Sequence, residues 1–190
     1  MNIFNIVISG VGGQGVLLAS KVFAESALAS GLDAKQNEVH GMAQRGGSVT
    51  SFVRIGDKVY SPAVIAGTAD LLIAFEPLEA LRYVHFLKPG GRLVYNTGTI
   101  NPSTVASGMA VYPKDVEEQI VRCCTNSHAI DALSIANKAG DVRAVNMVMV
   151  GSVIKNVPLD AKVIDGVVKT LSKGKGVEVN LSALRGGAAG

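Results

Sequence analysis

The 190-residue sequence has only two cysteines and no tryptophan. The cysteines, Cys123 and Cys124, are adjacent, so their Cα atoms lie about 3.8 Å apart across a trans peptide. A disulfide ordinarily spans about 4.4 Å or more between Cα atoms, and an iron–sulfur cluster takes about four cysteine ligands. These features exclude a disulfide-stabilised scaffold, and they argue strongly against an iron–sulfur protein that holds its cluster alone.

Long hydrophobic runs are also absent. The first residues lack the basic segment that opens a secretory signal peptide, and their apolar run is short. No stretch approaches the roughly 18 apolar residues that predict a transmembrane helix. Reduced thiols without an export signal are typical of the cytoplasm, so we expect a cytoplasmic protein with no membrane contact.

The formal net charge is only +3, and the surplus lies in the C-terminal part. Residues 1–150 contain twelve basic and twelve acidic side chains, whereas residues 151–190 contain six basic and three acidic ones. The lysines there stand among glycines without a neighbouring aromatic residue, so we expect no nucleic-acid partner. A solvated segment explains the charge better. We therefore predict one domain over residues 1–180 and a flexible tail over residues 181–190.

The sequence is rich in apolar residues, which make up 48% of it, and it contains 22 glycines. Such a chain can form a core and has many tight backbone sites. Short β-branched runs alternate with helical periodicity. Strands are predicted over residues 3–9, 34–39, 50–54, 58–60, 70–75 and 92–96, and helices over residues 14–30, 77–86, 116–123, 129–139, 145–155 and 160–171. This order predicts an α/β fold, a three-layer α/β/α sandwich with a mostly parallel, Rossmann-like sheet and an antiparallel hairpin insertion.

A glycine-rich loop connects the first predicted strand to the first helix. It comprises Gly10, Val11, Gly12, Gly13, Gln14 and Gly15. In the G-x-G-x-x-G pattern the first glycine turns tightly, the second admits close backbone approach, and the third lets helix pack on strand. The helix N-terminus then offers free N–H groups to a phosphate or carboxylate. The alternative is a tight turn that binds nothing.

Two cofactor hypotheses remain open for this loop, but for each of them the sequence lacks an acidic residue at the expected position. Binding of NAD requires an acidic residue at the end of the second strand, but Asp33 precedes that strand and Glu38 comes late in it. Residues 87–94 resemble a segment of S-adenosylmethionine-dependent methyltransferases. Those enzymes usually carry an acidic residue just before the glycines, where this chain has Ser9.

The most unusual segment is polar and follows the second predicted strand. It reads Asn37, Glu38, Val39, His40, Gly41, Met42, Ala43, Gln44, Arg45, Gly46, Gly47 and Ser48. Burying so many polar side chains without partners would cost several kcal/mol. We therefore expect a loop at the carboxyl edge of the sheet, where ligand crevices open in doubly wound folds.

Together, the glycine-rich loop and this polar segment resemble the gamma-type domain of 2-oxoacid:ferredoxin oxidoreductases. The likeness is greatest to the small, or beta, subunits of indolepyruvate:ferredoxin oxidoreductases, in which the sequence of residues 38–48 is typical. Residues 146–151 also resemble the family pattern. The resemblance extends over about residues 3–175.

The resemblance implies a subunit of an enzyme complex. Such complexes convert an aryl 2-oxoacid, coenzyme A and oxidised ferredoxin into an acyl-coenzyme A, carbon dioxide and reduced ferredoxin. Thiamine diphosphate and the iron–sulfur clusters are expected on the large (alpha) partner subunit. The present chain has neither the cluster cysteines nor a Gly-Asp-Gly thiamine motif, so it holds no cofactor alone and is expected to be inactive in isolation. It can also self-associate through the surface that would meet its partner.

The resemblance also singles out a substrate or partner loop. Its candidate residues are His40, Gln44, Arg45, Gly46 and Gly47. The guanidinium of Arg45 suits a substrate carboxylate, a coenzyme A phosphate or a partner carboxylate, with neutral hydrogen bonds from Gln44 and His40. Alternatively, Arg45 caps carbonyls of its own loop. No catalytic residue and no metal ligand is predicted, because the histidines and cysteines lack metal-ligand spacing.

Two other classes remain possible on the sequence alone. One is a free-standing Rossmann-type enzyme that uses NAD, flavin or S-adenosylmethionine. The other is an assembly module with an empty glycine loop.

Overall fold

A computed structural model describes residues 2–40, 46–172, 174 and 176–190, with only the backbone described at His40 and Ser103. Its centre is a six-stranded sheet in the order β2-β3-β1-β4-β5-β6. The strands are β1 (Phe4–Val11), β2 (Asp33–His40), β3 (Ser48–Gly56), β4 (Ala69–Ala74), β5 (Leu87–Asn96) and β6 (Ser127–Ile130). The predicted α/β fold class is confirmed.

All strands of this sheet except β3 run in the same direction. Strand β3 lies between β1 and β2 and is antiparallel to both, while β4, β5 and β6 continue the sheet in parallel. The antiparallel hairpin therefore consists of β2 and β3. The prediction that residues 58–60 form the second strand of a hairpin is wrong. They belong to a loop, because the partner of residues 50–54 is the preceding strand.

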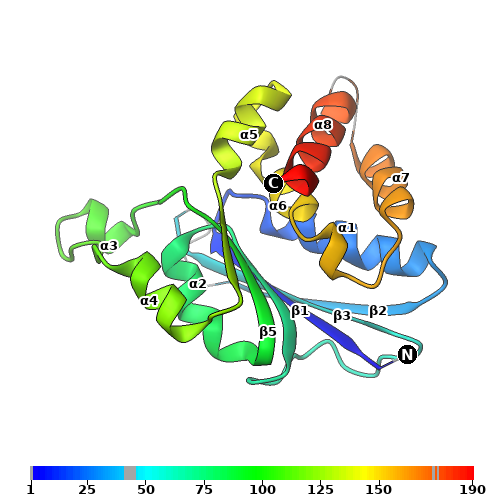
Figure 1. The fold of residues 1–190 in the computed structure, drawn as a ribbon, viewed down its shortest axis with the longest axis horizontal. Coiled ribbons are helices and arrows are strands. Elements are labelled where there is room, and N and C mark those ends of the chain that lie inside the picture. The colour runs from blue at the N-terminus through cyan, green and yellow to red at the C-terminus, as the bar shows by residue number, and fades with distance from the viewer. Residues whose placement is uncertain (1, 41–45, 173, 175) are drawn as a thin grey trace.

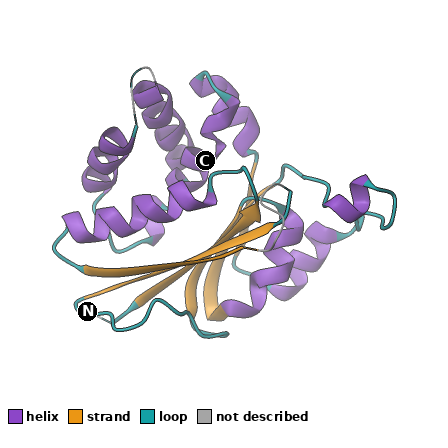
Figure 2. Cartoon of the chain, turned by 180° about the vertical axis from the view of Figure 1, so that it is seen from behind, coloured by secondary structure: helices purple, strands orange, loops and turns teal. Residues whose placement is uncertain are grey.

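Helices cover both faces of the sheet (Figures 1 and 2). One face carries α1 (Val16–Ala29), α5 (Ala132–Ala139), α6 (Val145–Gly151), α7 (Ala161–Leu171) and α8 (Gly176–Ala189). The other face carries α2 (Pro77–Tyr83) and α4 (Val116–Cys123), and the short helix α3 (Ser103–Ala106) projects beyond the sheet. Short 3-10 turns occupy Val84–Phe86, Val142–Ala144 and Ile154–Asn156.

The strands divide their side chains between two cores, as the period of two requires. In β1, Ile6 and Ile8 join the core beneath α1 and α6, whereas Val7 joins the core beneath α2 and α4. Helix α6 is buried at nearly every position, as its apolar sequence predicts. Residues 129–130, predicted as the start of a helix, instead end β6, and α5 begins at Ala132 after the N-cap Asp131.

The predicted flexible tail over residues 181–190 is wrong, because most of it is the second half of α8. Leu181, Leu184 and Gly187 of this helix are buried. The backbones of α6 and α8 approach so closely that a Cβ on Gly187 would lie 2.9 Å from the carbonyl carbon of Val148. Packing on α6 thus orders a segment whose glycine-rich composition indicates mobility. Among the described residues, no helix has the length and hydrophobicity needed to cross a membrane.

Candidate functional site

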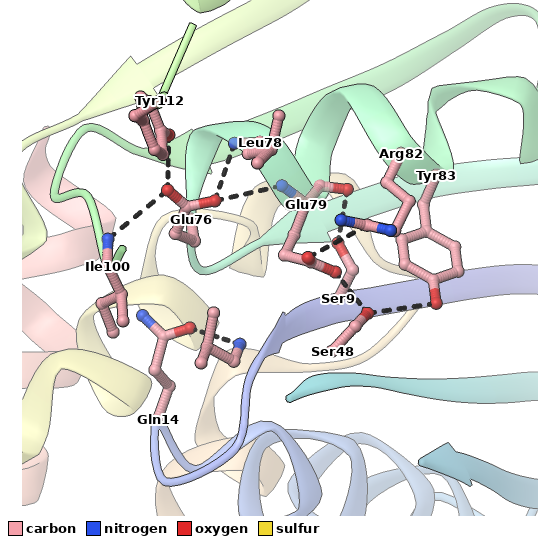
Figure 3. A network of polar contacts seen from close by, with 11 residues as sticks. Ser9, Gln14, Ser48, Glu76, Leu78, Glu79, Arg82, Tyr83, Ile100 and Tyr112 are labelled. Carbon is pink, nitrogen blue, oxygen red and sulfur yellow. Dashed lines mark hydrogen bonds and ion pairs between the residues drawn. The ribbon is translucent and has the colours of Figure 1, made fainter. Parts of the chain in front are cut away.

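The glycine-rich loop lies at the carboxyl edge of the sheet and is held there by Gln14. The Val11 amide donates to Gln14 Oε1 at 2.7 Å (Figure 3), and Gln14 Nε2 donates to the Phe75 carbonyl at 2.8 Å. One side chain thus ties the loop to the end of β4. Helix α1 starts at the left-handed Gly15 (φ 84°) without a side-chain cap. The predicted strand–loop–helix unit is confirmed, whereas ligand binding by the loop remains a proposal.

Two glycines of the motif allow close packing. A Cβ on Gly10 would lie 2.8 Å from Val16 Cγ2 and 2.9 Å from Phe75 Cβ. A Cβ on Gly15 would lie 2.6 Å from Asn146 Nδ2. The sequence predicts a tight turn at the first glycine, but Gly10 is paired within β1, and its role is to let the α1 and β4 ends approach. The third glycine makes room for α6, a helix distant in sequence.

The polar segment meets the glycine-rich loop directly. The Gly12 amide donates to the Gly47 carbonyl at 2.8 Å, and Gly46 has a left-handed φ of 73° that favours glycine. The expectation that both loops reach one edge of the sheet is therefore met at Gly12 and Gly47. His40 ends β2, but its side chain is outside the described part of the structure, as are Gln44 and Arg45. Their roles stay predictions.

A cavity of about 490 Å³ opens beside the junction of the two loops. Its lining is mostly apolar and comes from the glycine-rich loop, the first turn of α1, and strands β2 and β3. The lining residues are Val11, Gly12, Gly13, Gly15, Val16, Leu17, Leu18, Glu38 and Val49. Among these described residues Glu38 carries the only charge, so the lining suits an apolar group better than a phosphate.

A buried polar cluster supports the cavity from the other face of the sheet. Glu79 of α2 is only 4% exposed. Its Oε2 accepts the Ser48 hydroxyl at 2.5 Å, and its Oε1 accepts Arg82 Nε at 3.1 Å (Figure 3). The Ser48 hydroxyl also lies 3.4 Å from that of Tyr83. Because Ser48 opposes Val11 in the sheet, Glu79 positions the point where both loops meet.

Burial raises the pKa of the Glu79 carboxyl, although the Ser48 hydroxyl and the Arg82 guanidinium oppose this change. A raised pKa means that the folded state favours the protonated acid. This contribution to stability is therefore present at low pH and is lost as pH rises through the folded-state pKa.

We predict that Glu79→Gln, which cannot ionise, gains stability relative to the wild type as pH rises from about 4 towards 7. Urea unfolding across this range measures the difference. Glu118→Gln, on the exposed face of α4, is the matched control and should leave the buried cluster unchanged. A constant difference between Glu79→Gln and wild type at every pH would contradict the prediction.

Glu76 is a second buried carboxylate on the same helix, 1% exposed. Its Oε2 caps α2 by accepting the amides of Leu78 and Glu79 at 2.7 and 3.1 Å. Its Oε1 accepts the Tyr112 hydroxyl at 2.5 Å (Figure 3). The sequence places Glu76 directly before Pro77, which is a local signal for the start of a helix, whereas Glu79 was not predicted. The available signal was an acidic residue in the first turn, three positions after the cap.

The strand order argues against the hypothesis that the glycine-rich loop binds a dinucleotide. In dinucleotide-binding folds the second parallel strand lies directly beside the first, whereas here the antiparallel β3 separates β1 from β2. Asp33 begins β2 at the edge opposite the glycine-rich loop, where it accepts the Val59 amide at 2.8 Å. Asp33 is therefore placed to support a loop and not a ribose.

Comparison of the sequence with known proteins identifies a family and related subunits. Residues 5–190 match the family described as pyruvate ferredoxin/flavodoxin oxidoreductase, so the match includes the C-terminal helix that the sequence resemblance left out. The chain is 42% identical over 188 residues to the indolepyruvate oxidoreductase subunit IorB of Pyrococcus horikoshii, covering 96% of this chain and 93% of that subunit. The IorB subunit of Thermococcus kodakarensis is 40% identical over 188 residues, with the same two coverages.

A solved structure gives the same relationship in three dimensions. The gamma subunit of a keto/oxoacid ferredoxin oxidoreductase from Geobacter sulfurreducens superimposes with a TM-score of 0.71 at 25% identity. The superposition covers 97% of this chain and 95% of that subunit. The likeness therefore spans the whole fold and is not limited to the glycine-rich loop.

Proposed function

Because the chain belongs to the pyruvate ferredoxin/flavodoxin oxidoreductase family, we propose that it is the small subunit of an indolepyruvate:ferredoxin oxidoreductase. The observation that carries this proposal is the match to indolepyruvate oxidoreductase subunits IorB along nearly their full length. The complex would cleave the bond between the carboxylate and the carbonyl of an aryl 2-oxoacid. Carbon dioxide leaves, the acyl group joins the sulfur of coenzyme A as the thiol releases its proton, and the two electrons pass to oxidised ferredoxin.

The proposal assigns thiamine diphosphate and the iron–sulfur clusters to the larger subunit. The two cysteines of this chain are too few for a cluster, and its sequence has no Gly-Asp-Gly thiamine motif. Cys123 is exposed and Cys124 is buried, and the described residues contain no group of three or more potential metal-ligating side chains. No chemical step is therefore assigned to this chain's side chains, and its part is to bind and cover reactants.

The cavity beside the two loops supports such a covering role. Its apolar lining suits the aryl ring of the 2-oxoacid or the pantetheine arm of coenzyme A. Gly12, Gly13 and Gly15 of the glycine-rich loop line it. In this proposal Arg45 provides the cation that the described lining lacks.

We predict that Leu17→Asp raises the KM of the complex for coenzyme A or for the 2-oxoacid about tenfold or more, because a buried leucine contact is worth about 1.5–3 kcal/mol. Leu17 lines the cavity and is 44% exposed. Leu28→Asp is the matched control, since Leu28 is 52% exposed on the same helix but does not line the cavity. Unchanged KM values for both reactants in Leu17→Asp would show that the cavity binds neither.

A further inference from the structure

The segment between β5 and α4 leaves the carboxyl edge of the sheet and projects from the body of the protein (Figure 1). We call residues 97–113 the arm. Its turn is closed by its own backbone, because the amides of Met109 and Ala110 donate to the Thr104 carbonyl at 2.9 and 3.0 Å. The Gly108 amide donates to the Val105 carbonyl at 3.0 Å. The arm therefore has a defined shape without support from the sheet along its outer part.

The composition of the arm is unusual for an exposed projection. None of its 17 residues is Asp, Glu, Lys, Arg or His. Met109 is 77% exposed, Val111 83% and Ile100 37%. Single exposed apolar residues are ordinary, but an apolar group rimmed by polar residues marks a contact surface. Interface cores are likewise depleted in charge and enriched in methionine.

One buried carboxylate holds both ends of the arm. Glu76 Oε1 accepts the Tyr112 hydroxyl at 2.5 Å and the Ile100 amide at 3.4 Å. Burial, and then the hydrogen bond to Glu76, raise the pKa of Tyr112, so the phenol keeps the proton that it donates. The cap bonds of Glu76 fix the same carboxylate to α2. The arm is thus ordered before it meets a partner, which lowers the entropic cost of association.

We propose that the arm inserts into an uncharged, apolar recess of the larger subunit. This proposal rests on the proposed function, which supplies that partner. The arm leaves the same edge of the sheet as the glycine-rich loop, so a subunit that closes over the cavity also meets the arm.

A second copy of this chain is the alternative occupant, and the oligomeric state of the wild-type chain distinguishes it from the larger subunit.

The test measures binding of the purified chain to the purified larger subunit of the same organism by biolayer interferometry. We expect the double variant Met109→Asp/Val111→Asp to bind about 30-fold more weakly or worse, as for central interface residues. Ile65→Asp is the matched control: Ile65 is 73% exposed in the loop after β3, at the opposite edge of the sheet, and its replacement should change Kd less than about twofold.

A second variant leaves the exposed surface of the arm unchanged. Tyr112→Phe removes the hydroxyl that Glu76 holds and should weaken binding by about three- to tenfold through loss of preorganisation. Circular dichroism and thermal unfolding confirm that each variant is folded.

Wild-type affinity in the folded double variant would overturn the arm proposal and leave the proposed function standing. So would a wild-type homodimer that the double substitution dissociates without changing affinity for the larger subunit. If the wild-type chain itself does not bind the larger subunit, the proposed function fails and the arm proposal fails with it.

Discussion

Replacing Gly187 by alanine is expected to lower the free energy of unfolding by about 3 kcal/mol or more, and the melting temperature by about 6–12 °C. The new methyl group would overlap the Val148 carbonyl oxygen and lie 3.0 Å from the Ser152 amide nitrogen. These are backbone atoms of α6, so no side-chain rotation can relieve the overlap. Gly151→Ala should act similarly, because its Cβ would lie 2.8 Å from the carbonyl carbon of Leu184 in α8.

Gly166→Ala provides the control for this effect. Gly166 lies in the interior of α7, and no described atom beyond its chain neighbours and its own helix backbone lies within 4 Å of the position of its Cβ. Alanine there should stabilise the protein by about 0.5–1 kcal/mol through helix propensity alone. Thermal and urea unfolding of the variants distinguish the two environments. A Gly187→Ala protein as stable as wild type would mean that α8 does not pack on α6 as described.

Gly15→Ala is expected to destabilise the protein by about 2–4 kcal/mol, for two separable reasons. The left-handed backbone at φ 84° costs a residue with a side chain about 1–2 kcal/mol. The Cβ would also lie 2.6 Å from Asn146 Nδ2 and 3.1 Å from Asn146 Cβ, which adds an overpacking cost. The same displacement would shift a wall of the cavity, so reactant binding by the complex should weaken as well.

A double-mutant cycle with Asn146→Ala separates these reasons. Truncating Asn146 removes the contact with its amide but leaves its Cβ at 3.1 Å and the left-handed backbone in place. The double variant should therefore be more stable than the sum of the two single effects predicts, by about 1 kcal/mol or more. Strict additivity in urea unfolding would show that the Asn146 amide adds nothing to the cost of Gly15→Ala.

Local sequence patterns predict the elements of the fold better than their pairing. The buried strands at residues 3–9 and 70–75 and the helix at residues 14–30 appear where their periodicity places them. The position of β3 between β1 and β2 is a long-range property, since residues 50–54 alternate equally well beside any neighbour. The same limit explains the error at residues 181–190, where α8 depends on contact with α6 and local glycine content suggests mobility.

The candidate site was predictable where backbone chemistry defines it. The glycine-rich loop and the approach of residues 46–47 follow from their sequence and their places after strands. The support from Glu79 was missed, because burial of a carboxylate depends on the strands packed over it. The cap by Glu76 is by contrast a local feature, because Glu76 directly precedes Pro77 at the start of a helix.

Reconstitution of this chain with its larger subunit, followed by ferredoxin reduction with indolepyruvate, tests directly whether the two chains form the enzyme. Coenzyme A-dependent reduction is expected when both chains are present, and nearly all activity should be lost when this chain is omitted. Full activity of the larger subunit alone would contradict the proposed function. So would dehydrogenase or methyltransferase activity of this chain alone with NAD, flavin or S-adenosylmethionine.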